Sequence, residues 1–480
     1  MKSMWKIRTI PMAVLVFGMS MSSAAQNSPP SQSAPSQSTP DTTPAPAFGQ
    51  NEPVLNPENP PVTGLDEPSL NLRTSSRSFI SPALQVSESA DTNGGNELDY
   101  HGLEGITRIL GALDLQQFWP KSDLFLEYLG GGAFYSAPYD VRQIQAVGFE
   151  AVTRWRTGQV TLRDAFSYLP DGSFEIGTFG GAPGFGLANG VGTGMQGGGL
   201  PGSHLFGSGG LGGASVGNTP RLTNTAILDA VQAITPVSAI TVAGGFSNAH
   251  FYDPTQVLIN SDQLTVEGGY SHLLNRHDQI GAVYAFQLFQ FPQFTGGQIY
   301  IHILNIRYSH TITGKLNLIV GAGPQYTELE EGGYLSTWSL SARVQLRYRM
   351  GHASLIASYE KFTAAGSGLY AGANVQTGRL AYNRPLGRTW EFYGDTGFSH
   401  NVKLQGAAGL GINAGSYDDG FVSAIFRKHI GRSYEFLAAY RFGEEAFSVP
   451  IDVLGNQGRI NERQVGSVGL EWHPHPTRIE

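Results

Sequence analysis

A repeated two-faced pattern constrains this chain most. Between Trp338 and Tyr348 every second side chain is apolar, and the side chains between them are polar or ionised. A period of two is the pattern of a β-strand with two different faces. The pattern recurs in residues 388–400 and 432–442. Ionised side chains that alternate this regularly with apolar ones indicate a sheet with water on one face and an apolar medium on the other.

Aromatic residues stand at the ends of these apolar rows. A soluble β-sandwich could also bury one apolar face, but strands of ten to fourteen residues with an aromatic at each end are typical of lipid-facing strands. The sequence therefore favours a membrane β-barrel over a sandwich. The predicted aromatic girdle consists of Trp338, Tyr348, Trp390, Phe398, Tyr434, Phe442 and Trp472.

The opposite faces carry ionisable and amide side chains, which we expect to line a lumen. Such residues can set ion preference through rings of charge. The alternative is a wet inner wall of mutually paired charges with no selectivity. The predicted lumen-lining residues are Arg163, Glu267, Arg307, Arg343, Gln345, Arg347, Glu391, Asp395, Glu435, Arg441 and Glu471.

The connections alternate between short and long. Eight tight turns occur between 120–122 and 429–432, and nine longer links occur between 91–102 and 444–462. These seventeen connections predict an antiparallel up-and-down barrel of about eighteen strands, with a range of 14–18. An even number of strands places both termini on the periplasmic side. A barrel of this size encloses a water-filled lumen.

The N-terminus has the features of a secretory signal. Three basic residues precede an apolar run at 10–19, and small residues follow at 23–25. This run is about half of the ~20 residues that cross a bilayer as a helix, which argues against an uncleaved anchor. We therefore predict a signal peptide at 1–25.

The segment 26–77 is rich in Pro and Ser and has few large apolar residues. This composition predicts a disordered linker, with a ligand for a peptide-binding domain as the alternative. The barrel is then expected to occupy 78–480.

Composition excludes several kinds of chemistry. The chain has no Cys, which excludes disulfides, Cys-ligated metals and a thiol nucleophile. Only 14% of its 480 residues are charged, against roughly a quarter in ordinary domains, and the net charge is -8. Without a basic excess, nucleic acid is not an expected partner.

A Gly-rich segment covers residues 177–217, with 18 Gly in 41 residues and no charged residue. Residues 192–197 match the GxGxxG dinucleotide fingerprint, but the strand, helix and acidic residue that this motif needs are missing. The segment is interpreted as a flexible outer loop. Its Phe and Leu residues favour a sharper alternative, in which it folds inward and constricts the lumen.

No catalytic, cofactor-binding or metal site is predicted. His473 and His475 are separated by Pro and have only Glu471 nearby, which is typical of a solvated tail. No Gly-x-Ser-x-Gly motif identifies a nucleophile. An outer-membrane hydrolase would require a Ser and a His adjacent on one outward-facing strand pair.

From about Phe79 onwards the chain resembles bacterial outer-membrane β-barrels. The stretches 113–119 (LDLQQFW), 123–132 (DLFLEYLGGG) and 164–174 (DAFSYLPDGSF) are similar to uncharacterised acidobacterial proteins of this type. The resemblance implies an outer-membrane location and a barrel architecture, and no activity. The chain departs from such barrels because Trp472 is followed by eight further residues, whereas the assembly machinery commonly recognises a terminal aromatic.

Together these features predict a non-enzymatic, porin-like channel for passive passage of small solutes. The alternative is a structural anchor or a polymer-export component of the outer membrane. The expected partners are outer-membrane lipid, the barrel assembly machinery and small solutes.

Overall fold

The computed structural model describes residues 78–93, 99, 102–136, 139–169, 220–252, 258–293, 297–330, 334–351, 353–364, 370–404, 415–431, 433–453, 456–472, 474 and 477–478. The chain divides into two units, Met1–Thr43 and Pro44–Glu480. All described residues belong to the second unit. The predicted signal peptide, linker and Gly-rich segment lie outside them.

The described residues form nineteen strands. Their bounds are β1 (Phe79–Asp91), β2 (Glu104–Phe118), β3 (Ser122–Ser136), β4 (Tyr139–Trp155), β5 (Gly158–Leu169), β6 (Arg221–Thr235), β7 (Ser238–Phe251), β8 (Ser261–Leu273), β9 (Asp278–Gln290), β10 (Gln298–Thr313), β11 (Leu316–Glu330), β12 (Tyr334–Met350), β13 (Ala353–Ala364), β14 (Ala373–Leu386), β15 (Trp390–Lys403), β16 (Ser416–Ile430), β17 (Tyr434–Val453), β18 (Asn456–Trp472) and β19 (Thr477–Arg478). Within the described ranges, no helix has the length and apolar character needed to cross a membrane.

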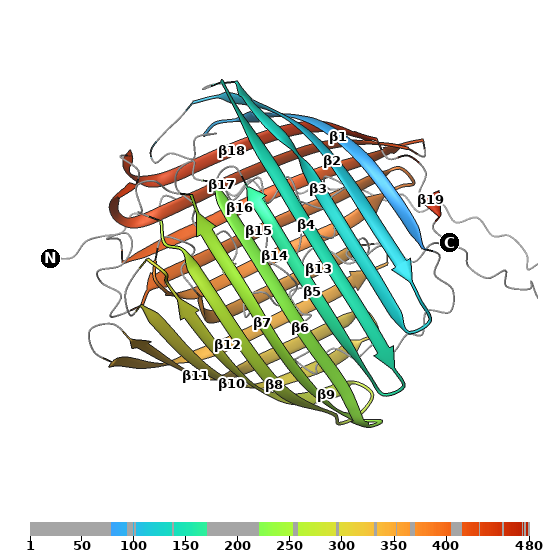
Figure 1. Cartoon of the computed structure of the whole chain (residues 1–480), viewed down its shortest axis with the longest axis vertical. Coiled ribbons are helices and arrows are strands. Elements are labelled where there is room, and N and C mark those ends of the chain that lie inside the picture. The colour runs from blue at the N-terminus through green and yellow to red at the C-terminus, as the bar shows by residue number, and fades with distance from the viewer. Residues whose placement is uncertain are drawn as a thin grey trace, which may run out of the picture. The chain divides into compact units, whose positions relative to one another are not determined.

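The sheet closes on itself. Each strand from β1 to β18 pairs antiparallel with the next, and β18 pairs back to β1 from Leu84–Trp472 to Asp91–Val465. The short strand β19 pairs with the first two residues of β1. The wall is therefore an up-and-down barrel of eighteen strands, as predicted, and Figure 1 shows these strands wrapping around a common interior.

The short turns lie where the sequence predicted them. Three of them contain a Gly with positive φ: Gly351 at 60°, Gly387 at 85° and Gly431 at 69°. Gly adopts this backbone conformation without the steric cost that a Cβ brings. Each of the eight short turns joins an even-numbered strand to the next odd-numbered one, so they lie at one edge of the barrel, and the other nine connections lie at the opposite edge. Three of the nine links predicted to be long are mostly strand instead: β3 ends at Ser136 and β4 begins at Tyr139, β11 ends at Glu330 and β12 begins at Tyr334, and β17 ends at Val453 and β18 begins at Asn456.

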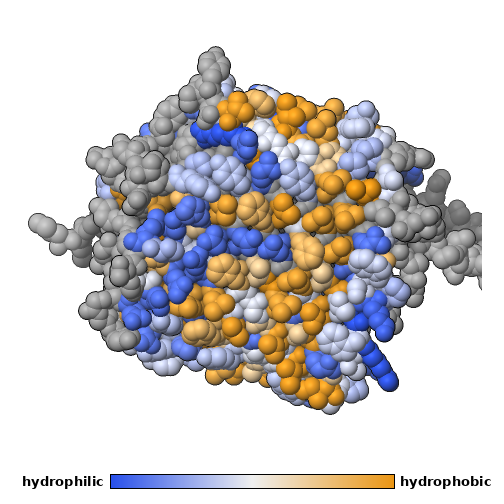
Figure 2. All heavy atoms as spheres, in the orientation of Figure 1, coloured by the Kyte–Doolittle hydropathy of each residue, from blue (hydrophilic) through white to orange (hydrophobic). Residues whose placement is uncertain are grey.

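The two faces of the wall differ as the alternation predicted. In β12, Trp338 and Leu340 are 71% and 52% exposed, whereas Ser341 and Arg343 are each 7% exposed. In a closed sheet the buried face is the interior face. Figure 2 shows apolar residues over much of the visible outer surface.

The seam between β1 and β18 carries side-chain hydrogen bonds across it. Ser467 Oγ donates to Ser89 Oγ at 2.8 Å, and Asn93 Nδ2 donates to Asn461 Oδ1 at 2.9 Å. All four side chains are buried. These bonds reinforce a junction whose backbone register covers only eight residue pairs.

Candidate functional site: the barrel interior

The predicted lumen-lining residues occupy the buried face of the wall wherever their side chains are described. Glu267, Arg307, Arg343, Gln345, Glu435, Arg441 and Glu471 are buried, and Arg347 and Glu391 are half-buried. The backbones of Arg163 and Asp395 lie in β5 and β15, but their side chains are outside the description. Whether these residues line a solute path stays a prediction.

One charged group lies on the interior of β8 to β13. Arg343 Nε is 3.2 Å from Glu360 Oε1, and these residues face each other in the register of β12 and β13. The carboxylate of Glu267 interacts electrostatically with Arg307 and Arg343. Gly321 leaves room for this arrangement, since a Cβ there would be 3.1 Å from Cγ of Arg307. The group balances two carboxylates against two guanidinium groups.

A second interior group combines arginine with an aromatic ring. The guanidinium of Arg441 lies 4.2 Å from the ring centroid of Phe421, and that of Arg379 lies 5.9 Å from it. Both distances allow cation–π attraction. Three strands, β14, β16 and β17, supply these side chains, so the group can form only once the sheet has assembled.

A third group lies near the short-turn edge. Arg427 Nε is 3.3 Å from Glu435 Oε2, and Arg427 Nη1 is 3.8 Å from Glu391 Oε2. His429 Nδ1 lies 2.9 Å from Glu435 Oε1. The sequence analysis identified both carboxylates but missed Arg427. The signal was available, because Arg427 continues the odd-numbered row of Asp419, Phe421, Ser423 and Ile425 in β16.

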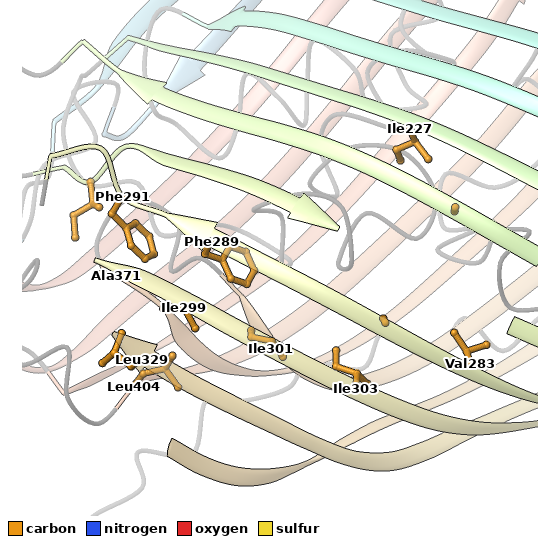
Figure 3. Packing of buried hydrophobic residues seen from close by; sticks show 13 residues of the cluster. Ile227, Val283, Phe289, Phe291, Ile299, Ile301, Ile303, Leu329, Ala371 and Leu404 are labelled. Atoms are coloured by element: carbon orange, nitrogen blue, oxygen red, sulfur yellow. The ribbon is translucent and has the colours of Figure 1, made fainter. Parts of the chain in front are cut away.

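Apolar side chains also form clusters in the interior, two of which extend to the long connections. The sequence analysis did not predict them. The first apolar cluster, drawn in Figure 3, consists of Ile227, Ala243, Ile259, Val283, Ala285, Phe289, Phe291, Ile299, Ile301, Ile303, Leu329, Ala371 and Leu404. The second apolar cluster consists of Ala249, Phe251, Leu258, Phe362, Tyr370, Ala373, Val375, Tyr417, Phe447 and Ile451.

The second apolar cluster joins distant parts of the wall. It contains residues of β7, β13, β14, β16 and β17, and β7 and β16 lie half a ring apart in an eighteen-stranded barrel. Leu258 and Tyr370, which bring these parts together, belong to long connections and are buried. Side chains from these connections therefore occupy the interior and narrow it at this edge.

The packing around Gly372 shows how tightly one connection is held. Gly372 has a φ of 89°, and a Cβ there would lie 2.5 Å from Cδ1 of Ile299 and 2.7 Å from Cδ1 of Leu404. The backbone N–H of Leu404 donates to Gly372 O at 3.2 Å. Two connections thus pack on each other and on β10. Beside them, burial raises the pKa of the Tyr370 hydroxyl.

The predicted girdle residues lie on the exposed face of their strands. Six of them are exposed, and Phe442 is half-buried. The Tyr326 and Trp338 ring centroids are 5.0 Å apart, and Lys428 Nζ lies 5.1 Å from the Trp390 ring centroid. Their role at a membrane interface stays a prediction.

The part of the chain that the structure describes contains no candidate metal-binding site. No group of three or more His, Asp or Glu side chains that could hold an ion occurs there. His473 and His475 lie outside the described residues.

No family model matches the chain, and no curated protein matches it. Among solved structures it is similar to OccK5 (OpdH) of Pseudomonas aeruginosa, with 11% identity and a TM-score of 0.40 over 84% of this chain and 98% of that chain. It is similar to a BenF-like porin of Pseudomonas fluorescens Pf-5, with 10% identity and a TM-score of 0.40 over 83% and 99%. It is also similar to the FrpB iron transporter of Neisseria meningitidis, with 8% identity and a TM-score of 0.39 over 82% of each chain. Similarity at this level assigns no function to the chain.

Proposed function

We propose that this chain is an outer-membrane β-barrel that passes small solutes through its interior as a porin-like channel. The observation that carries the proposal is the closed, two-faced wall of eighteen strands. Barrels with sixteen or more strands are wide enough to hold an aqueous lumen. The interior carries buried polar and ionised side chains, which a dry core would not tolerate in such number.

The outer face supports a membrane location. Large apolar side chains are exposed on strands around the wall, including Leu228, Val266, Ile306, Leu340 and Val422. Closure satisfies the backbone hydrogen bonds that an open sheet edge would leave unmet in lipid. A cleaved signal peptide at 1–25 and insertion by the barrel assembly machinery would bring the chain to the outer membrane.

The interior charges support weak ion selectivity rather than a charged filter. Arg343 pairs with Glu360, and Arg427 pairs with Glu435. A pair of opposite charges creates little net field along a pore, so it favours neither cations nor anions strongly. The sequence left two alternatives open: rings of charge that select ions, or a wall of paired charges with no selectivity. These ion pairs support the second alternative more directly.

The test is the conductance of the purified full-length protein in a planar bilayer. Steady open steps with a reversal potential close to zero in a salt gradient support a weakly selective channel. A folded protein, verified by its heat-modifiable shift on a gel, that gives no steps contradicts the channel.

The alternative function is a structural anchor or a polymer-export component. The second apolar cluster favours it, because this cluster crosses the interior and narrows the path. A folded protein that gives no conductance steps in the planar bilayer would support this alternative. No catalytic activity is proposed, and the resemblance to uncharacterised acidobacterial barrel proteins adds architecture alone.

A further inference from the structure

The wall separates between β12 and β13. Their register runs from Met350–Ala353 at the short turn to Ala342–Lys361 and ends there. Beyond that point, residues 334–341 of β12 pair with β11. The last three residues of β13 pair with β14. Within the described residues, the two strands therefore diverge although both continue. We call this separation the β12–β13 gap.

The gap opens inside the apolar band of the outer face. On β12 this band runs between the predicted girdle residues Trp338 and Tyr348, and the pairing ends at Ala342. The four residues from Trp338 to Ala342 correspond to about 13 Å of strand at 3.3 Å per residue. An unpaired strand edge at this depth in lipid is unfavourable, because its backbone groups have no water there. Such an edge calls for a functional explanation.

On its inner side, the gap leads to the second apolar cluster. The end of β13 reaches the interior side chains of β11, because the buried Gln325 Nε2 of β11 donates a hydrogen bond to the buried Thr363 Oγ1. Thr363 Oγ1 donates in turn to Asn374 Oδ1 of β14 at 2.9 Å. The neighbouring Phe362 is a buried member of the second apolar cluster, together with Tyr370. The inner mouth of the gap is thus next to aromatic side chains.

On its outer side, the gap is bordered by apolar side chains that face the surroundings. Leu340 lies beside the gap, and Trp338 is the most exposed member of the predicted girdle. Tyr326 stacks near Trp338 with a centroid separation of 5.0 Å. Apolar groups therefore lie on both the inner and the outer side of the gap.

The seam between β1 and β18 provides a contrast. Its register is also short, with eight pairs, but Ser467–Ser89 and Asn93–Asn461 hydrogen bonds bridge the two strands. At the β12–β13 gap, the hydrogen bond of Thr363 goes past β12 to β11 instead. The seam is bridged directly from strand to strand, whereas the end of β13 is hydrogen-bonded to β11 and β14.

We propose that the β12–β13 gap is a lateral exit through which an uncharged, apolar small molecule passes between the barrel interior and the surrounding lipid. A charged solute would lose its hydration at aromatic mouths and is not expected to take this route. The proposal rests on the membrane location given under the proposed function. It does not require the axial path to conduct ions.

Cysteine labelling tests the gap directly, because the chain has no Cys of its own. Ser339→Cys places a thiol on the inner face of the unpaired part of β12. Ser358→Cys places one on the interior of β13, where it faces Gln345 across an intact strand pair. Each variant is reconstituted in lipid vesicles. It is then treated with N-(1-pyrenyl)maleimide dissolved in the lipid, or with a water-soluble trimethylammonium methanethiosulfonate.

For each variant, the rate of thiol labelling by the lipid-dissolved maleimide is divided by the rate of labelling by the water-soluble reagent. We expect this ratio to be several-fold higher for Ser339→Cys than for Ser358→Cys. Equal ratios would overturn the proposal, since the gap would then give lipid no access to the interior. This result is independent of ion conductance. A protein that labels as expected but gives no ionic steps contradicts the channel and leaves the lateral exit supported.

A disulfide across the gap provides the functional test. Extending the register places Leu340 opposite Thr363, so Leu340→Cys combined with Thr363→Cys would close the gap when oxidised. Leu346→Cys combined with Ala357→Cys is the matched control, because these residues already face each other in paired strands. The readout is entry of the fluorescent apolar probe N-phenyl-1-naphthylamine into the outer membrane of intact cells.

We expect oxidation of the gap variant to slow probe entry several-fold, reduction to restore it, and ionic conductance to stay unchanged. The control disulfide should change neither. Unchanged probe entry with the gap disulfide formed would overturn the proposal. Where the gap disulfide does not form, the labelling ratio of Ser339→Cys decides the outcome.

Discussion

Arg463 of β18 and Asp91 of β1 form a buried, doubly hydrogen-bonded ion pair across the seam of the barrel. Arg463 Nε lies 3.0 Å from both carboxylate oxygens of Asp91, and Nη2 lies 2.5 Å from Oδ2. Both side chains are almost completely buried. Two residues 372 positions apart in the chain thus fix how the last long strand meets the first.

We expect Asp91→Ala to destabilise the folded barrel by about 3–5 kcal/mol, because it leaves the Arg463 guanidinium buried without its carboxylate. Asp418→Ala is the control. It removes an exposed contact with His400, and such surface pairs contribute about 0–1 kcal/mol. The measurement is the free energy of unfolding in urea, with the barrel refolded into lipid vesicles. Equal losses in the two variants would contradict a special role for the seam pair.

The two faces of β12 allow a second prediction. Val344→Arg places a charge on the exposed apolar face and should cost about 2–4 kcal/mol near the membrane midplane. Ser341→Arg places the same side chain on the interior face, where it displaces a hydrogen bond from Asn305 but can reach a water-filled lumen, and should cost clearly less than Val344→Arg. The same unfolding measurement compares them. Similar costs on both faces would mean that the outer face is not in lipid.

The count of connections predicted the number of strands, and the alternation within single segments was enough to predict the strand faces. It could do so because a period of two is a local property that each strand carries in its own sequence. Arg343 and Leu340 were assigned to opposite faces on this basis, and their exposure agrees. The same rule applied to β16 would also have identified Arg427.

The interior contacts could not be predicted in this way. The approach of Gly372 to Ile299, and of Gln325 to Thr363, depends on where strands far apart in the sequence lie around the ring. Alternation tells which face a residue occupies but not which residue lies across the barrel. For the same reason the early end of the β12–β13 register could not be predicted, since both strands continue in sequence beyond it.

Removing residues 26–77, with the signal peptide retained, should leave the barrel able to fold. Among the described residues every strand begins at Phe79 or later, and the pairing of β1 with β18 already closes the wall that they form. The measurement is the heat-modifiable gel shift of the outer-membrane fraction. Loss of the shift in the deletion protein would show that the segment has a role in folding and is not a dispensable linker.

Gly372→Ala and Tyr370→Phe compare a steric clash with the loss of a hydroxyl group in the same connection. The Ala methyl would collide with Ile299 and Leu404 at a φ that favours Gly, so we expect a loss of about 1–3 kcal/mol. Tyr370→Phe removes a buried hydroxyl to which the described residues offer no hydrogen-bond partner, and should be neutral or stabilising. Urea unfolding measures both. A large loss for Tyr370→Phe would show that the hydroxyl has a partner.

The last prediction concerns the Gly-rich segment, which lies outside the described residues. It has no charged side chains to keep it in water, and its Phe and Leu residues are spaced by glycines that permit many backbone angles. We expect it to fold inward and narrow the lumen further, beside the connections that contribute Leu258 and Tyr370.

Deletion of residues 180–211 should therefore leave the barrel folded and raise its single-channel conductance. The heat-modifiable gel shift checks the fold, and a planar bilayer measures the conductance. Gly372→Ala provides a comparison, because it disturbs the described connections and leaves the Gly-rich segment intact. If the deletion protein folds and its conductance equals that of the full chain while Gly372→Ala changes it, the constriction belongs to the described connections. The Gly-rich segment would then lie outside the pore.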